Sequence, residues 1–206
     1  SIDPKQFMKI FIEWTKDILE KKTGKKISID GKAIKSATDK INNGNIPYIV
    51  SAFIGEIGLS IGEVKVDDKS NEITAIPELL DLLDIEGATI TIDAIGTQED
   101  IVNKIVNKGG HYVLPVKDNQ RILKKEIKSQ FDSYNNLLGN PEVFHKSTVD
   151  KDHGRIEERE YYLTYNTSKI TDKEKWNTVN AVAYMRVTRT ERDETTITDN
   201  YYIIDN

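Results

Sequence analysis

The sequence predicts an α/β fold in which helices cover a mixed sheet, with a strand-rich region toward the carboxyl terminus. Residues 26–138 alternate between strand-like and helix-like patterns, which is typical of a sheet covered by helices. Beyond Gly139, four segments in succession favour strands. We therefore expect a helix that packs on the core at 1–25, the α/β core at 26–138 and a β-rich insertion at 139–206.

Each element follows from a local pattern. Apolar residues recur every three or four positions from about Pro4 to Lys22, which predicts an amphipathic helix. Pro77 suits the first turn of a helix, and Asp118 or Asn119 suits a helix cap. β-branched runs predict strands at 26–30, 48–54, 59–66, 88–93, 111–116, 144–149, 155–164, 179–188 and 196–204. Apolar periodicity predicts further helices at 77–83, 98–107 and 120–138.

Composition and charge exclude several classes of protein. The sequence has no cysteine, which excludes disulfides and thiolate zinc sites. Its most apolar stretch, residues 46–61, is too interrupted by Gly and Pro for a membrane helix. The formal net charge of −5 disfavours DNA binding over the whole surface. Residues 104–128 hold 7 basic and 2 acidic side chains, which permits a local phosphate-binding surface, although a solvated helix face explains this charge better.

Two segments share the pattern I-x-I-D, at Ile27–Asp30 and at Ile90–Asp93. In each strand the isoleucines share one face and the aspartate lies on the other. If the strands are parallel neighbours, both carboxylates emerge at the sheet edge where α/β proteins bind ligands. Converging carboxylates repel each other unless a divalent cation lies between them, and Mg²⁺ prefers such ligands. Aspartates also end strands and cap turns, so the two explanations are about evenly balanced.

Five motifs occur in a fixed order: I-D-G-K (29–32), N-E-I-T-A-I-P (71–77), T-I-D-A-I-G-T-Q (91–98), Y-V-L-P-V-K-D-N-Q (112–120) and H-G-R-I-E-E-R (153–159). Together they resemble the insertion-sequence transposases related to the H-repeat-associated proteins of bacteria. The resemblance covers about residues 7–203, and five ordered motifs are far more specific than any one alone. It implies a ribonuclease-H-like fold with a DDE active site for DNA cleavage and strand transfer.

The resemblance assigns Asp30 and Asp93 as the first two catalytic, metal-binding carboxylates. Two Mg²⁺ or Mn²⁺ ions, roughly 3.5–4 Å apart, would activate a water or a 3′-hydroxyl and stabilise the departing oxygen. The family's third carboxylate is a glutamate in an HW-x-IEN-type motif on a later helix. No such motif occurs up to Asn206, so we expect an incomplete metal site, with that helix absent and this chain alone inactive.

Other motif residues are predicted to contact DNA: Lys32, Lys117, Asn119, Gln120, Arg155 and Arg159. Glu157 is the internal alternative for the third carboxylate. It lies on a predicted strand rather than a final helix, so a partner of the two neighbouring arginines is the better interpretation. Surface ion pairs and helix capping are simpler explanations for several of these residues.

The expected partners are the DNA of the insertion-element ends and of the target, with a homodimer assembled on DNA in the bacterial cytoplasm. Two alternatives stay open. One is a decayed transposase that holds DNA without chemistry, which the net charge favours. The other is a different ribonuclease-H-like nuclease, such as one that resolves DNA junctions.

Overall fold

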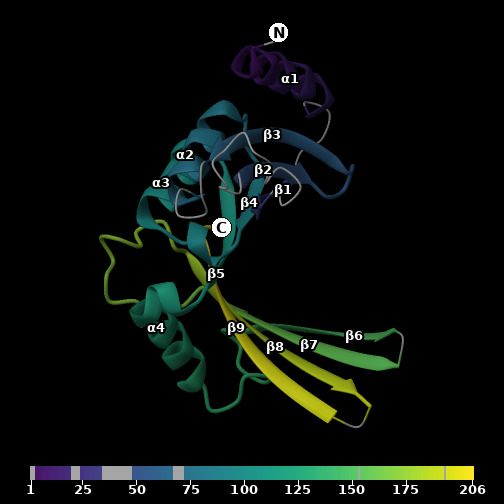
Figure 1. Ribbon diagram of the computed structural model, residues 1–206. Helices are drawn as coiled ribbons and strands as arrows, with labels where there is room; N and C mark the ends of the chain where they lie inside the picture. The colour runs from purple at the N-terminus through teal and green to yellow at the C-terminus, as the bar shows by residue number, and fades with distance from the viewer. Residues whose placement is uncertain (1–2, 20–23, 34–47, 67–71, 153, 193) are drawn as a thin grey trace. The chain divides into compact units, whose positions relative to one another are not determined.

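The computed structural model describes residues 3–19, 24–33, 48–66, 72–152, 154–192 and 194–206. The chain folds as two compact units, Ser1–Leu114 and Pro115–Asn206 (Figure 1). None of the helices in the described ranges is long and apolar enough to cross a membrane.

A mixed sheet forms the centre of the first unit. The strands that the structure describes there are β1 (Lys26–Ala33), β2 (Tyr48–Ile54), β3 (Leu59–Val66), β4 (Thr89–Ile92) and β5 (His111–Val116). Their order is β3-β2-β1-β4-β5. Strand β2 is antiparallel to both neighbours, whereas β4 is parallel to β1 and to β5. This is the ribonuclease-H-like arrangement that the sequence motifs imply.

Three helices belong to the first unit: α1 (Pro4–Leu19), α2 (Glu72–Leu82) and α3 (Glu99–Asn107). Helix α2 packs on β2 and β3 and contacts α3, while α1 contacts β3. The apolar side chains that α2 buries recur on one helical face and reach the core, at Ala75, Ile76, Leu79 and Leu80. A short 3₁₀ turn, η3 (Ala94–Gly96), joins β4 to the segment before α3.

Helix α2 begins at Glu72, so the expectation that Pro77 occupies the first turn is wrong. A proline inside a helix cannot donate to the carbonyl four residues earlier, here that of Ile73. Burial of the apolar face of α2 therefore outweighs the loss of one hydrogen bond.

The second unit combines a helix with a long antiparallel ribbon. Helix α4 (Arg121–Asp132) follows the 3₁₀ turn η4 (Asp118–Gln120). The described strands are β6 (Phe144–Asp152), β7 (Arg155–Thr164), β8 (Ala181–Glu191) and β9 (Glu194–Ile204), in the order β9-β8-β7-β6. The strands expected in this region are confirmed, and β6, β8 and β9 run further toward the turns than expected.

Stacked tyrosines form the core on one face of the ribbon. The rings of Tyr162, Tyr184 and Tyr201 lie 5.5 Å and 5.4 Å apart, from centroid to centroid. Phe131 of α4 lies 5.6 Å from the Tyr184 ring, so the helix covers this face. Burial of these aromatic rings against one another contributes strongly to the stability of the second unit.

Both ends of α4 differ from the sequence expectation. The capping position is Gln120, and no side-chain bond caps the helix there. Asp118 forms an ion pair with Lys124 at 2.9 Å. The helix ends at Asp132 rather than near Leu138. Ser133 donates a hydrogen bond to the carbonyl of Gln130 at 2.6 Å, which competes with continuation of the helix.

Candidate functional site

The two I-x-I-D segments form neighbouring parallel strands. In the register of β1 and β4, Ile29 lies opposite Ile92, so Asp30 and Asp93 each follow one member of the same pair. The isoleucines are buried and both aspartates are exposed, as the alternation of side chains requires. Pairing with β4 stops here, but β1 continues to Ala33 because β2 still pairs with it. The expected end of this strand at Asp30 is therefore wrong.

Asp30 and Asp93 line the same pocket of the first unit. Its volume is about 90 Å³, several times the ~10–15 Å³ that one water molecule needs. Apolar side chains form much of its wall: Ile29, Val50, Ile76, Ile92 and Ile95. Charged groups against such a wall interact more strongly than in bulk water, because the local dielectric constant is lower.

Asp93 also shapes the chain that follows it. Its Oδ1 accepts a hydrogen bond from the backbone N–H of Ala94 at 2.6 Å, which caps η3. On the same strand faces, the hydroxyl groups of Ser28 and Thr91 lie 3.1 Å apart. The aspartates thus stand at the end of a polar face on two paired strands.

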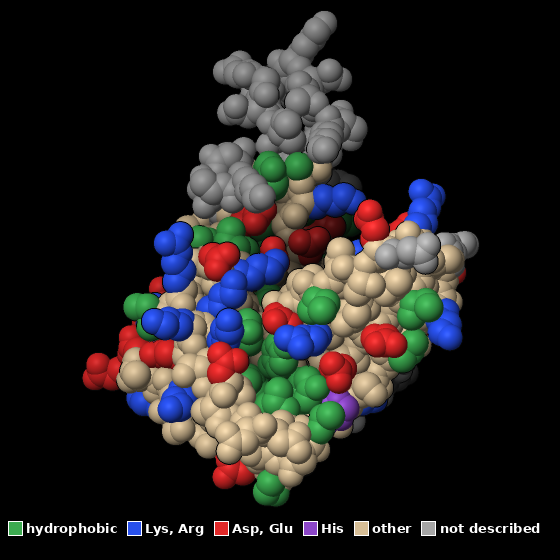
Figure 2. Space-filling view, turned by 90° about the horizontal axis from the view of Figure 1, so that it is seen from below, with side chains coloured by type: hydrophobic (Ala, Val, Ile, Leu, Met, Phe, Trp, Pro, Cys, Tyr) green, Lys and Arg blue, Asp and Glu red, His purple; other side chains and the backbone are tan. Residues whose placement is uncertain are grey.

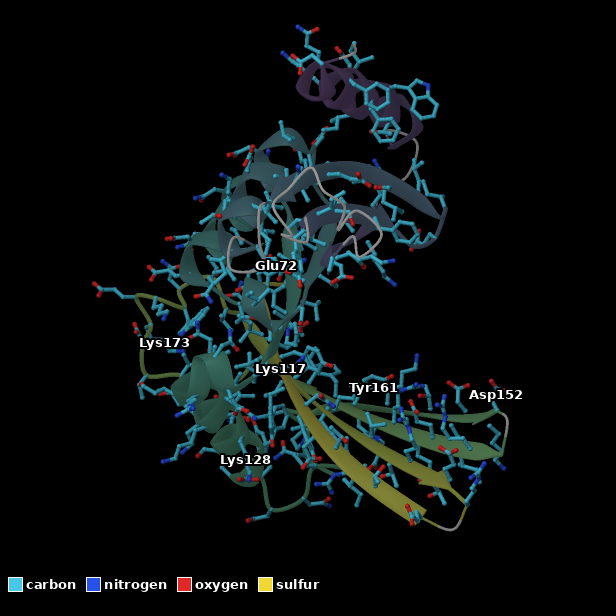
Figure 3. All side chains as sticks on the ribbon, in the orientation of Figure 1. Glu72, Lys117, Lys128, Asp152, Tyr161 and Lys173 are labelled. Atoms are coloured by element: carbon cyan, nitrogen blue, oxygen red, sulfur yellow. The ribbon has the colours of Figure 1, made fainter. Side chains whose placement is uncertain are left out.

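Glu72 is a third carboxylate at this pocket, and the sequence reasoning missed its role there. It is the first residue of α2, labelled in Figure 3, and is only 7% exposed. Its carboxylate lies against Gly31: a Cβ atom at that glycine would be 2.5 Å from Oε1. The N-E-I-T-A-I-P motif was the available signal, but nothing local shows that the helix start meets β1.

The donor chemistry of the pocket suits a hard divalent cation. Carboxylate oxygens are the ligands that Mg²⁺ prefers, and Mg²⁺ usually keeps several waters, for which the pocket has room. The described residues nevertheless contain no group of three His, Cys, Asp or Glu side chains placed closely enough to hold a metal ion. Asp30 and Asp93 stay the candidate ligands that the sequence predicted, and both line this pocket.

The remaining predicted contacts divide between the two units. Lys32 is exposed on β1. Lys117, Asn119 and Gln120 lie in and beside η4 of the second unit. Figure 2 shows basic and acidic side chains interspersed over the face it views.

Arg155, Glu157 and Arg159 lie on β7 of the second unit. Glu157 is 4% exposed and contacts both of these arginines. It also contacts Arg189 of β8, at 2.9 Å from Nη2 to Oε2. The sequence reasoning missed Arg189, because only the strand register shows that it lies opposite Glu157.

Comparison with known proteins fits this geometry. A sequence profile described as the transposase DDE domain matches residues 23–198. The chain belongs to the DDE transposase family. The resemblance inferred from the five motifs is thereby confirmed. The DDE domain is the catalytic domain of such transposases, and members of the family generally use divalent metal ions.

Two relatives show how much of a DDE transposase this chain covers. It is 37% identical to the H repeat-associated protein YhhI of Escherichia coli (strain K12), over 98% of this chain and 54% of YhhI. It is 43% identical to YncI of Escherichia coli O157:H7, named as a candidate transposase, over 84% of this chain and 44% of YncI. The chain thus spans about half the length of these relatives.

A solved structure of a transposase is also similar in outline. The piggyBac transposase in a synaptic complex with hairpin DNA matches with a TM-score of 0.43 and 12% identity. The match covers 90% of this chain and 34% of that one.

Proposed function

We propose that this DDE transposase domain serves metal-dependent DNA cleavage and strand transfer at the ends of an insertion element. Asp30 and Asp93 are its proposed catalytic and metal-binding residues. The observation that supports this most directly is their position in one pocket, at the end of two paired parallel strands. The membership of the chain in the DDE family also supports this proposal.

The proposed role of the two aspartates is to hold the positive charge of metal ions at one position in the pocket. When bound, Mg²⁺ or Mn²⁺ ions supply the positive charge that activates an attacking hydroxyl group and stabilises the departing 3′ oxygen. Both carboxylates are exposed, so an ion and a phosphodiester can reach them from solvent. The hydrogen bond from the backbone N–H of Ala94 orients the carboxylate of Asp93.

The proposed partner is DNA, both at the element ends and at the target, bound by a homodimer that assembles on it. The residues proposed to contact DNA are Lys32, Lys117, Asn119, Gln120, Arg155 and Arg159. Basic side chains at phosphates supply affinity without reading the sequence. Glu157 stays a prediction for an additional acidic residue.

Titration with Mn²⁺ tests the metal site. We expect Asp30→Asn and Asp93→Asn each to weaken Mn²⁺ binding about tenfold or more, since a ligand matters at least as much as its hydrogen-bonded neighbours. Asp84→Asn is the matched control, because Asp84 is an exposed aspartate of the same unit outside the pocket. Unchanged Mn²⁺ affinity in both aspartate variants would remove these residues from the metal site.

A reaction assay separates this proposal from the alternatives. The protein that carries this chain is incubated with labelled element-end DNA and Mn²⁺. Joined products with target DNA identify a transposase, and cleavage without joining identifies another nuclease. DNA binding with neither product identifies a decayed transposase. Either Asp30→Asn or Asp93→Asn should abolish cleavage while circular dichroism shows an intact fold.

A further inference from the structure

A group of arginines surrounds Glu157 on one face of the ribbon. In the strand register, Glu157 lies opposite Arg189 of β8 and opposite Asp150 of β6. Arg155 and Arg159 are two residues away on β7, so their side chains emerge on the same face as Glu157. We call Arg155, Arg159 and Arg189 the arginine group.

Both carboxylate oxygens of Glu157 bind arginines. Oε1 accepts a hydrogen bond from Nη2 of Arg159. Oε2 accepts one from Nε of Arg189 at 3.0 Å, and Nε of Arg155 lies 3.8 Å from the same oxygen. The Glu157 side chain is 5% exposed, whereas those of Arg155, Arg159 and Arg189 are 44%, 30% and 49% exposed. The arginines thus cover the carboxylate and keep one side open to solvent.

Acidic side chains on the same face of the ribbon balance the charges of the arginine group. The hydrogen bond from Arg189, followed by the charges of the arginine group, lowers the pKa of Glu157, which therefore stays ionised at neutral pH. Asp150 forms an ion pair with Nη1 of Arg159 at 3.0 Å. The guanidinium groups are therefore held by carboxylates while they stay partly exposed to solvent.

Neutral hydroxyl groups flank two of the three arginines. Thr148 of β6 lies opposite Arg159, and Thr196 of β9 lies opposite Arg189. Both threonines are exposed and share the face of the arginine group. Hydroxyl groups beside arginines are common donors to phosphate oxygens. These hydroxyl groups are further donors beside the guanidinium groups of Arg159 and Arg189.

The end of the ribbon differs in charge. Arg155 lies opposite Asp152 of β6 and Glu191 of β8. Asp152, labelled in Figure 3, stands at the end of the ribbon. Acidic side chains thus lie on both sides of Arg155, whereas Arg159 and Arg189 each have a threonine opposite them on one side.

We propose that Glu157 is a positioning residue that holds Arg159 and Arg189 as a pair of guanidinium groups ready to bind DNA phosphates. The planar guanidinium group binds phosphate through two parallel hydrogen bonds, and a carboxylate that already holds one edge fixes the orientation of the rest. Such preorganisation reduces the entropy lost on binding. The identification of the anion as DNA backbone rests on the proposed function.

The salt dependence of DNA binding tests the arginine pair. Fluorescence anisotropy with a short labelled duplex is measured over a range of salt concentrations, in EDTA so that no metal ion contributes. Arg159→Gln and Arg189→Gln should each reduce the slope of log K against log salt by about 0.9, the loss of one phosphate contact. The control Lys169→Gln, at an exposed lysine of the same unit, should leave the slope unchanged. Unchanged slopes in both arginine variants would overturn the proposal.

Glu157→Gln tests positioning through the sign of its effect. If Glu157 only offsets positive charge, its neutralisation should tighten DNA binding. If it positions the arginines, binding should weaken about threefold or more, because free side chains must be ordered on binding. Tighter binding overturns the proposal.

Arg189→Lys provides a second measurement that does not depend on how well Glu157→Gln folds. The lysine keeps the charge but not the planar group. We expect an unchanged slope with weaker affinity, and unchanged affinity would argue against guanidinium geometry. The Mn²⁺ titration of Asp30→Asn and Asp93→Asn is made without DNA and does not involve the arginines. Failure of the arginine variants therefore leaves the metal-site proposal intact, and the reverse also holds.

Discussion

Glu72 and Glu157 are both buried carboxylates, but the charged groups around them have opposite signs. Glu157 lies beneath three arginines of the ribbon, and the protein itself supplies more positive charge than this carboxylate needs. Glu72 lines a pocket with two further carboxylates, those of Asp30 and Asp93. An acidic pocket attracts cations from solution, whereas an arginine group attracts anions. We infer that the first unit recruits metal ions and that the second recruits phosphates.

The largest expected effect concerns the close packing at Glu72. Gly31→Ala should destabilise the chain by about 0.5–1.5 kcal/mol, because the new Cβ would lie 2.5 Å from the carboxylate and the buried Glu72 side chain must leave its present rotamer. Gly55→Ala is the matched control, since no atom lies within 4 Å of a Cβ there. Urea unfolding followed by circular dichroism measures both.

A double variant sharpens this test. If the clash with Glu72 causes the loss, Gly31→Ala should cost less in the Glu72→Ala background than alone. Equal costs in both backgrounds, or a loss no larger than that of Gly55→Ala, would contradict the packing described.

The acid stability of the ribbon tests the surroundings of Glu157. Its pKa is lowered from 4.5, chiefly by the hydrogen bond from Arg189. The stability gained from this carboxylate is therefore present above about pH 4.5 and is lost as the pH falls through the lowered pKa. The unfolding free energy should fall more steeply with acid in the unmodified chain than in Glu157→Gln.

Asp199 also has a lowered pKa, chiefly because of a hydrogen bond from Arg186. It is present in both proteins, so the difference between the two curves isolates Glu157. An unperturbed glutamate has a pKa of roughly 4.3, so the comparison covers about pH 5 to pH 2. Parallel unfolding curves over this range would show that the arginine group does not stabilise the ionised form of Glu157.

An exposed carboxylate should give the smallest effect. Asp81 is 61% exposed and pairs with Lys104 at 2.6 Å. Its coupling to Lys104 should be worth less than about 1 kcal/mol, because solvent screens the pair. A double-mutant cycle of Asp81→Asn and Lys104→Gln measures this coupling. A coupling energy as large as the destabilisation caused by Gly31→Ala would mean that burial does not determine which of these changes has the larger effect.

Local patterns predicted the regular elements well. The hairpin strands β2 and β3 and the strand β5 have the expected bounds, since alternation and turn residues are encoded within a few positions. Helix ends were less predictable. Pro77 marks a helix start in isolation, but the buried face of α2 begins five residues earlier. Packing against β2 and β3 decides that boundary.

The candidate site shows the same division. The repeated I-x-I-D pattern and the family motifs are enough to indicate Asp30 and Asp93 as candidate metal ligands. Their entry into one pocket depended on β1 and β4 being parallel neighbours. The roles of Glu72 and Arg189 could not be predicted from the sequence, because each contacts a residue that is distant in the sequence. Glu72 is 41 residues from Gly31, and Arg189 is 32 residues from Glu157.

The sequence by itself determined the strand and helix periods, the two aspartates and the family, because these depend on neighbouring residues and on ordered motifs. Only the tertiary structure decided which buried carboxylate lines the pocket of Asp30 and Asp93 and which one contacts arginines. Strand register and helix packing determine these contacts. Burial then determines how strong the interactions are, because charges removed from water interact most strongly with the groups that replace it.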